Sequence, residues 1–176
     1  MQITSFRFQS QVGYIRLYFE DSFLIGLDFE GSAESGTRIV GQLSRFLPME
    51  QCREQETPAA RQVQDWLENY FSGSAEPFTL PMKLYGTEFQ QRVWQELLCL
   101  QRGEVLSYAQ LAQRVQCNGV RAVGTAVGKN TIPIIVPCHR IVRQDGVIGK
   151  FGAGNGTESK RLLLQLEGVT RWNSKK

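Results

Sequence analysis

The chain has 176 residues and a formal net charge of +3, with 41% hydrophobic and 21% charged residues. This is the composition of an ordinary globular protein, and the length allows one domain or two small ones. No apolar run approaches the roughly 20 residues of a membrane span. The N-terminus also lacks the basic start and apolar core of a signal peptide. We therefore expect a cytoplasmic protein with no membrane partner.

The two halves of the chain differ in charge. Residues 1–80 hold 6 Lys/Arg against 11 Asp/Glu, a net of −5, whereas residues 81–176 hold 14 against 6, a net of +8. A basic half indicates a polyanionic partner such as nucleic acid. The alternative is that charge simply varies along any chain.

The first elements are predicted to be strands. Residues 13–19 and 23–29 are rich in β-branched and aromatic side chains, and residues 20–22 between them form a hairpin-turn candidate. A helix is expected to begin at Thr57, the N-cap, and Pro58, the first helical position. Residues 72–88 carry Pro and Gly at several positions and are predicted to be a linker.

The second half is predicted to be mainly helical. Thr87 and Ser107 each begin a capping box, with Gln three residues later. The helix after Ser107 and a further helix over residues 120–127 are separated by a short turn containing Gly119. Two short helices joined in this way indicate a helix-turn-helix. A last helix is expected from about Glu158.

These elements predict an α+β protein of two domains. Residues 1–80 form a small sheet-and-helix domain, and residues 81–176 form a helical domain with the helix-turn-helix.

The cysteine pattern indicates neither disulfides nor a zinc site. Cys52, Cys99, Cys117 and Cys138 show no CxxC spacing, and His139 is the only histidine. A cytosolic setting argues against disulfides. No metal or other cofactor is therefore expected. Cys99 is predicted to lie on the apolar face of its helix, in the core.

The run over residues 132–142, IPIIVPCHRIV, sets Cys138 beside His139 at the end of an apolar stretch. Pro137 has a fixed φ and no N–H, so Cys138 is predicted to sit at a rigid strand-to-helix corner. The helix N-terminus would there favour a nucleophilic thiolate. The alternative is a small apolar cysteine that closes a strand.

This run resembles the active-site signature of the O6-alkylguanine-DNA alkyltransferases, also called methylated-DNA–protein-cysteine methyltransferases. The resemblance extends over roughly residues 80 to 168. The other matching blocks are residues 89–94 (FQQRVW), 103–108 (GEVLSY), 121–124 (RAVG) and 128–130 (GKN).

The resemblance implies roles for the residues around the cysteine. Cys138 would be the nucleophile, His139 would act on its thiol through a water, and Glu167 would orient the imidazole. Arg121 would fill the space of an extruded nucleotide, and Tyr108 would help rotate the nucleotide and contact its base. Taken alone, Glu167 reads as a solvated helix-end carboxylate, Arg121 as a phosphate contact and Tyr108 as a core aromatic.

Four further positions are implied to contribute to base binding. Asn130 would join the recognition helix to the active-site strand, and Val127 would be a further DNA- or base-binding residue. Phe151 and Gly152 would face the base from a glycine-rich segment. That segment departs from the family pattern of an aromatic residue, then Ser or Ala and a Gly-Gly pair, so the resemblance does not specify the preferred alkyl group.

The resemblance thus implies direct reversal of O6-alkylguanine, and also of O4-alkylthymine, in double-stranded DNA. Cys138 would keep the alkyl group as a thioether, so each monomeric molecule would act once without a cofactor. One alternative is a non-catalytic binder of alkylated DNA or a regulatory helix-turn-helix protein. A second is a Cys-His hydrolase, which would turn over repeatedly.

Overall fold

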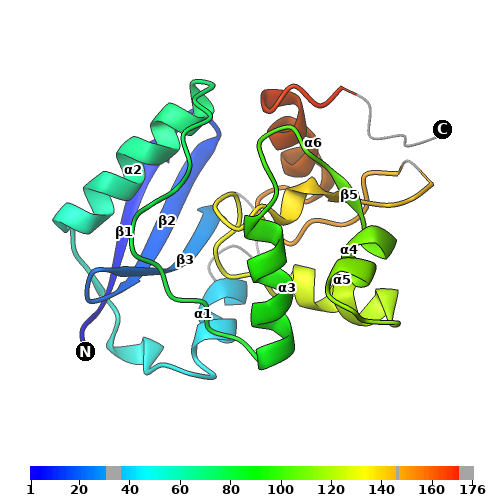
Figure 1. Ribbon diagram of the computed structural model, residues 1–176. Coiled ribbons are helices and arrows are strands. Elements are labelled where there is room, and N and C mark those ends of the chain that lie inside the picture. The colour runs from blue at the N-terminus through cyan, green and yellow to red at the C-terminus, as the bar shows by residue number, and fades with distance from the viewer. Residues whose placement is uncertain (31–36, 146, 171–176) are drawn as a thin grey trace. The chain divides into compact units, whose positions relative to one another are not determined.

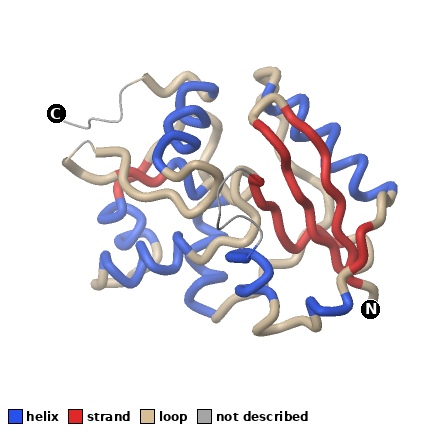
Figure 2. The backbone as a smooth tube through the Cα atoms, turned by 180° about the vertical axis from the view of Figure 1, so that it is seen from behind, coloured by secondary structure: helices blue, strands red, loops and turns tan. Residues whose placement is uncertain are grey.

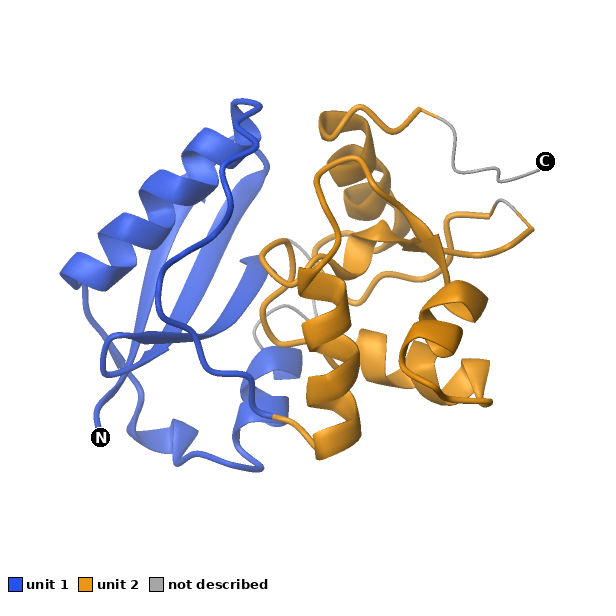
Figure 3. Cartoon of the chain, in the orientation of Figure 1, with its two compact units in different colours: residues 1–85 blue, residues 86–176 orange. Residues whose placement is uncertain are grey.

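The computed structural model describes residues 1–30, 37–145 and 147–170. The chain forms two compact units, residues 1–85 and residues 86–176 (Figure 3). Unit 1 is built on a sheet and unit 2 is mainly helical, so the predicted α+β class is confirmed. No helix within the described ranges is long and apolar enough to cross a membrane.

Unit 1 contains a four-stranded sheet with the strand order β3-β2-β1-β4 (Figures 1 and 2). Its strands are β1 (Ile3–Ser10), β2 (Gly13–Glu20), β3 (Phe23–Glu30) and the short β4 (Arg53–Glu54). The predicted pair, β2 and β3, is confirmed. Strand β1 was not among the predicted strands. It forms because it pairs along its whole length with β2, from Ile3↔Glu20 to Ser10↔Gly13.

Two helices cover parts of this sheet. In α2 (Pro58–Phe71), Thr57 Oγ1 accepts a hydrogen bond from Ala60 N, as the predicted N-cap requires. The buried side of α2 contacts β1. Helix α1 (Thr37–Leu43) packs on β3 at Gly26, where an added Cβ would lie 2.9 Å from Ile39 Cγ2. A short 3-10 turn, η1 (Met49–Gln51), completes the unit.

The last part of the predicted linker is fastened to the sheet. Leu24 N donates to Pro81 O at 3.0 Å, and Lys83 N donates to Leu24 O at 2.9 Å. The buried Glu20 carboxylate accepts from Lys83 Nζ at 2.7 Å and from Tyr85 Oη at 2.6 Å. The division between the two units therefore falls after Tyr85.

The described part of unit 2 contains the α-helices α3 (Glu88–Leu98), α4 (Tyr108–Arg114), α5 (Val120–Gly128) and α6 (Thr157–Leu166). Both capping boxes are present, at Thr87 and at Ser107. The buried Trp94 donates its Nε1–H to Ala126 O at 2.8 Å and so joins α3 to α5. Helices α4 and α5 are joined by the predicted tight turn, in which Gln116 has a φ of 53°. The expected helix-turn-helix is thus present.

The apolar run before Cys138 is not a strand, contrary to prediction. Residues 131–136 form consecutive bends and turns, and Ile134 has a φ of 74°, which is unusual for a β-branched residue. Pro133 and Pro137 lack the N–H groups that a strand ladder needs. The only pairing near Cys138 in the described chain joins β5 (Leu106–Ser107) to β6 (Ile141–Val142), which lies just beyond it.

Candidate functional site

Cys138 is buried, with 7% of its surface exposed, and it begins the 3-10 turn η2 (Cys138–Arg140). The predicted α-helix after the cysteine is therefore only one three-residue turn. Such a turn has too few aligned peptides to act as a macrodipole. Stabilisation of a thiolate must come from side chains instead.

Asn130 is the side chain that joins the turns to the sulfur. Its Oδ1 accepts from Ile132 N at 2.9 Å, and its Nδ2 donates to Val136 O at 2.8 Å. The same Nδ2 lies 3.1 Å from Cys138 Sγ. Because the amide holds both ends of the turn, it also fixes the direction of the sulfur. Asn130 is 2% exposed, so it acts beneath the surface, within the support of the cysteine.

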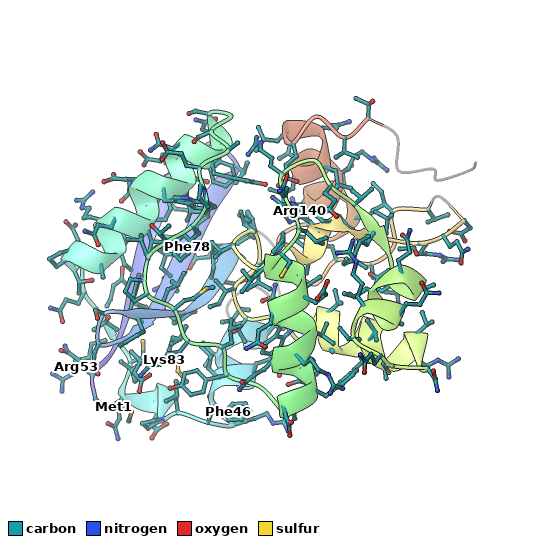
Figure 4. The ribbon with its side chains drawn as sticks, in the orientation of Figure 1. Met1, Phe46, Arg53, Phe78, Lys83 and Arg140 are labelled. Carbon is teal, nitrogen blue, oxygen red and sulfur yellow. The ribbon has the colours of Figure 1, made fainter. Side chains whose placement is uncertain are left out.

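Glu167, at the end of α6, binds the side chains of the two residues that follow the cysteine. His139 Nε2 lies 2.9 Å from Glu167 Oε1. Arg140 binds the same carboxylate with two nitrogens, Nε to Oε2 and Nη2 to Oε1, both at 2.9 Å (Arg140 is labelled in Figure 4). Its Nη1 donates to Leu100 O at 2.5 Å. Glu167 is 8% exposed, so it is not a solvated helix-end carboxylate.

The protonation states follow from burial and from Arg140. Burial acts to raise the pKa of Glu167, but the hydrogen bonds and charges of its partners outweigh burial and lower the pKa well below its usual range. Burial also lowers the pKa of His139, although Glu167 opposes this change. His139 is therefore neutral at neutral pH, and Arg140 is the cation that keeps Glu167 ionised.

One nitrogen of the neutral His139 imidazole is not used in the contact with Glu167. Because Glu167 is ionised and accepts, His139 Nε2 carries the proton, and Nδ1 holds the lone pair. Nδ1 is buried and has no hydrogen-bond partner among the described residues. A ring nitrogen in this state can accept a proton from a neighbouring thiol, directly or through a water.

Lys160 is a further residue of the site that was not predicted. It lies on α6 and is 0% exposed, and its Nζ donates to Ile141 O at 2.5 Å. Burial lowers its pKa to about 8, against an opposing interaction with Cys138. From the sequence, Lys160 resembles a surface residue, because it is charged and follows Glu158 at the start of its helix. Only its position in the i, i+3, i+4 pattern with Leu163 and Leu164 placed it on the buried face.

Tyr108 lies near the same groups, at the start of α4. Burial raises the pKa of its hydroxyl, and the charge of Cys138 adds to this effect. The Lys160 ammonium is 5.8 Å from the centroid of the Tyr108 ring. The tyrosine, lysine and cysteine thus form one electrostatic cluster.

A cleft of about 1140 Å³ opens beside Tyr108. One part of its lining comes from α5, including Arg121, Gly124 and Thr125, and another comes from the chain between β6 and α6. The Tyr108 ring passes closely between two glycines: an added Cβ at Gly124 or at Gly149 would lie 3.7 Å from it. Arg121 itself is exposed on α5.

The remaining predicted residues are placed as follows. Val127 is 5% exposed, because it shares the buried side of α5 with Val123 and Ala126. Phe151 is half-buried and Gly152 is exposed, in the irregular segment before α6.

The other cysteines lie away from Cys138 in sequence and environment. Cys99 is exposed at the C-cap of α3, so the prediction that it lies in the core is wrong. The last turn of α3 carries it past the apolar side, whose buried residues end at Leu97. Cys52 is half-buried, and burial raises the pKa of its thiol. No group of three or more His, Cys, Asp or Glu that could hold a metal occurs within the described ranges.

The chain matches two family models along most of its length. Residues 7–84 match the ribonuclease-like domain of 6-O-methylguanine DNA methyltransferase, and residues 88–169 match its DNA-binding domain. A methylated-DNA–protein-cysteine methyltransferase of Haemophilus influenzae is 43% identical over 139 residues, which cover 77% of this chain and 76% of the relative. A constitutive enzyme of the same name from Bacillus subtilis is 41% identical over 116 residues, covering 65% of this chain and 70% of the relative.

A solved structure extends the likeness to nearly the whole chain. The Mycobacterium tuberculosis protein OGT, crystallised in complex with DNA, superposes with a TM-score of 0.78 at 32% identity. The match covers 97% of this chain and 96% of that one. The chain belongs to the methylated-DNA–protein-cysteine methyltransferase family.

Proposed function

We propose that this protein repairs O6-alkylguanine in double-stranded DNA by moving the alkyl group to Cys138. Its relatives are named for methyl transfer from methylated DNA to a protein cysteine, the matching family domains are named for 6-O-methylguanine, and the related M. tuberculosis protein was crystallised with DNA. The observation that carries the proposal is the buried chain of contacts around Cys138. Asn130 directs the sulfur, while Arg140 and Glu167 hold a neutral His139 whose Nδ1 has no protein partner in the described structure.

The chemistry is a single displacement. The thiol proton passes to His139, and the thiolate attacks the alkyl carbon, so that a C–S bond forms as the C–O bond breaks. The electron pair of the broken bond stays on the guanine O6, and a proton is returned to the base. The thioether product is not reversed by thiol exchange, so each molecule reacts once. The lesion is the alkyl donor, and no cofactor enters the step.

Lys160 assists the attacking sulfur, and Tyr108 assists the departing base. The Lys160 ammonium is buried near Cys138 and favours the anionic form of the sulfur. The Tyr108 hydroxyl, whose raised pKa keeps it protonated, is a donor for the departing base.

A stacked base cannot reach a buried thiol, so the lesion must leave the duplex. Arg121, exposed at the start of α5 and on the lining of the cleft, takes the space of the extruded nucleotide. Phe151 and Gly152 contribute to the wall of the base pocket, and Val127 contributes from the buried side of α5. Activity on O4-alkylthymine, a monomeric state and a cytoplasmic location stay predictions.

Mass spectrometry tests the proposal directly. After incubation with duplex DNA that contains O6-methylguanine, the protein should gain one methyl group on the Cys138 peptide, with one methyl per molecule at completion. Cys138→Ser should transfer nothing yet still bind duplex, whereas the matched Cys99→Ser should behave as wild type. Repeated turnover would instead support a hydrolase. Binding of alkylated DNA without transfer by the wild type would support the non-catalytic alternative.

A further inference from the structure

The cleft beside Tyr108 carries more positive charge than the base-extrusion role of Arg121 requires. Its lining includes three cations, Arg121, Arg143 and Lys150, and a single carboxylate, Asp145. Arg121 comes from α5, whereas Arg143 and Asp145 come from the chain that follows β6. The extruded base is uncharged, so base binding does not account for the second arginine at the cleft.

The guanidinium of Arg143 is held at the cleft by two contacts. Its stem lies along Gly149, where an added Cβ would be 3.4 Å from Arg143 Cγ and 3.7 Å from Cδ. Its Nη2 lies 2.5 Å from Asp145 Oδ2. The Arg143 and Asp145 side chains are 57% and 50% exposed, so solvent and ligands can reach both.

Asp145 also shapes the backbone that presents this arginine. Its Oδ1 accepts from Val147 N at 3.1 Å, and Arg143 N donates to Val147 O at 3.1 Å. The Val147 hydrogen bond, followed by Arg143, lowers the pKa of Asp145, which is therefore an anion at neutral pH. One oxygen of the carboxylate thus binds the backbone N–H of Val147, and the other binds the guanidinium of Arg143.

We propose that Arg143 binds a backbone phosphate next to the extruded nucleotide, and that Asp145 holds its guanidinium until that phosphate arrives. Carboxylate and phosphate present similar oxygen pairs to a guanidinium, so Arg143 exchanges one for the other without moving its stem. An exposed ion pair of this kind is weak, so the exchange costs little. Arg121 would then replace the base, and Arg143 would secure the backbone of the same nucleotide. This inference rests on the proposed function.

Arg143→Gln tests the phosphate contact on two substrates. The transfer rate from O6-methylguanine in duplex DNA, measured below saturation, should fall by about tenfold, as expected for one charged hydrogen-bonded contact. The rate on free O6-methylguanine base, which has no phosphate, should fall much less. Arg143→Lys should keep part of the duplex rate that Arg143→Gln loses, because lysine carries the positive charge but lacks the paired N–H donors of a guanidinium.

Neutral DNA linkages identify the phosphate. Replacing either phosphate beside the lesion with a methylphosphonate should slow the wild-type protein at one of the two positions. Arg143→Gln should be insensitive to that same replacement, because the contact is already absent.

Asp145→Asn separates the roles of the carboxylate. Asparagine keeps an acceptor for Val147 N but frees Arg143, so binding to undamaged duplex should strengthen, with a salt slope steeper by about one contact. Matched controls are Arg61→Gln and Glu56→Gln in unit 1, where Arg61 Nε lies 2.6 Å from Glu56 Oε1 and both side chains are about half exposed. These should leave transfer and binding unchanged.

The inference would be overturned by an equal loss for Arg143→Gln on free base and duplex, by no loss on duplex, or by equal sensitivity of wild type and variant to both methylphosphonates. These results differ from a failure of the proposed function itself, in which the wild-type protein would transfer no methyl group from either substrate.

Discussion

Each unit of this protein contains a buried glutamate that binds neighbouring side chains, and the two glutamates serve different ends. In unit 1, Glu20 is 7% exposed and binds Lys83 and Tyr85, both of which lie in the segment that closes the sheet (Lys83 is labelled in Figure 4). In unit 2, Glu167 is 8% exposed and binds His139 and Arg140 beside Cys138. Both carboxylates are ion-paired, but the side chains of Glu167 and Arg140 are 0% and 9% exposed, whereas those of Glu20 and Lys83 are 10% and 39% exposed.

The difference lies in whether a partner of the glutamate keeps a buried polar atom without a hydrogen bond. Lys83 and Tyr85 donate to Glu20. The Lys83 side chain remains 39% exposed, so its ammonium can also be hydrated by solvent. His139 is fully buried, and its second nitrogen has no partner in the described structure. We therefore expect a buried carboxylate to take part in chemistry only when the group that it orients keeps an atom without a hydrogen-bond partner. Three substitutions test this distinction.

The largest effect is expected for Glu167→Gln. The change leaves Arg140 buried without a counter-charge, which costs about 3–5 kcal/mol of folding free energy. It also removes the anion that sets the tautomer of His139, so transfer from free O6-methylguanine base should fall by about a hundredfold or more. Urea unfolding and single-turnover kinetics measure the two effects. A destabilised variant that transfers at the wild-type rate would make Glu167 purely structural, like Glu20.

An intermediate effect is expected for Lys160→Met, which keeps the volume but removes the charge. The reaction of Cys138 with iodoacetamide at pH 7 should slow by about tenfold, the effect of one pKa unit. Because the pKa of Lys160 is lowered from 10.5 to about 8, the unfolded state binds more protons between these values. Wild-type stability should therefore gain a rising contribution across that window, and the variant should lack it. An unchanged iodoacetamide rate would remove Lys160 from the site.

The smallest effect is expected for Glu20→Gln. It weakens the contacts with Lys83 and Tyr85 and should cost about 1–2 kcal/mol of stability with no change in transfer rate. The hydrogen bonds from Lys83 and Tyr85 lower the pKa of Glu20 below its ordinary 4.5. Its contribution is thus present above that value and lost as pH falls through the lower, folded-state pKa. Acid unfolding monitored at fixed urea checks this. Loss of transfer activity in a folded Glu20→Gln protein would contradict the comparison.

The sequence predicted the helices of this protein better than its irregular segments. The capping boxes at Thr87 and Ser107 and the Thr57 cap are local signals, because each depends on residues three positions apart. The run before Cys138 carried the composition of a strand, but Pro133, Pro137 and the contacts of Asn130 turned it into buried turns. Strand β1 was missed, although it pairs with β2 along its whole length.

The sequence by itself determined the family and the adjacency of Cys138 and His139, because these are carried by contiguous blocks of residues. Only the tertiary structure decided which distant groups reach them. The resemblance implied Glu167, but its contact with His139, its pairing with Arg140 and the burial of Lys160 are known only from the folded unit 2. The same holds for the ion pair of Arg143 and Asp145 at the cleft. Solvation and charge pairing depend on what surrounds a side chain in space, and spacing along the chain does not specify that environment.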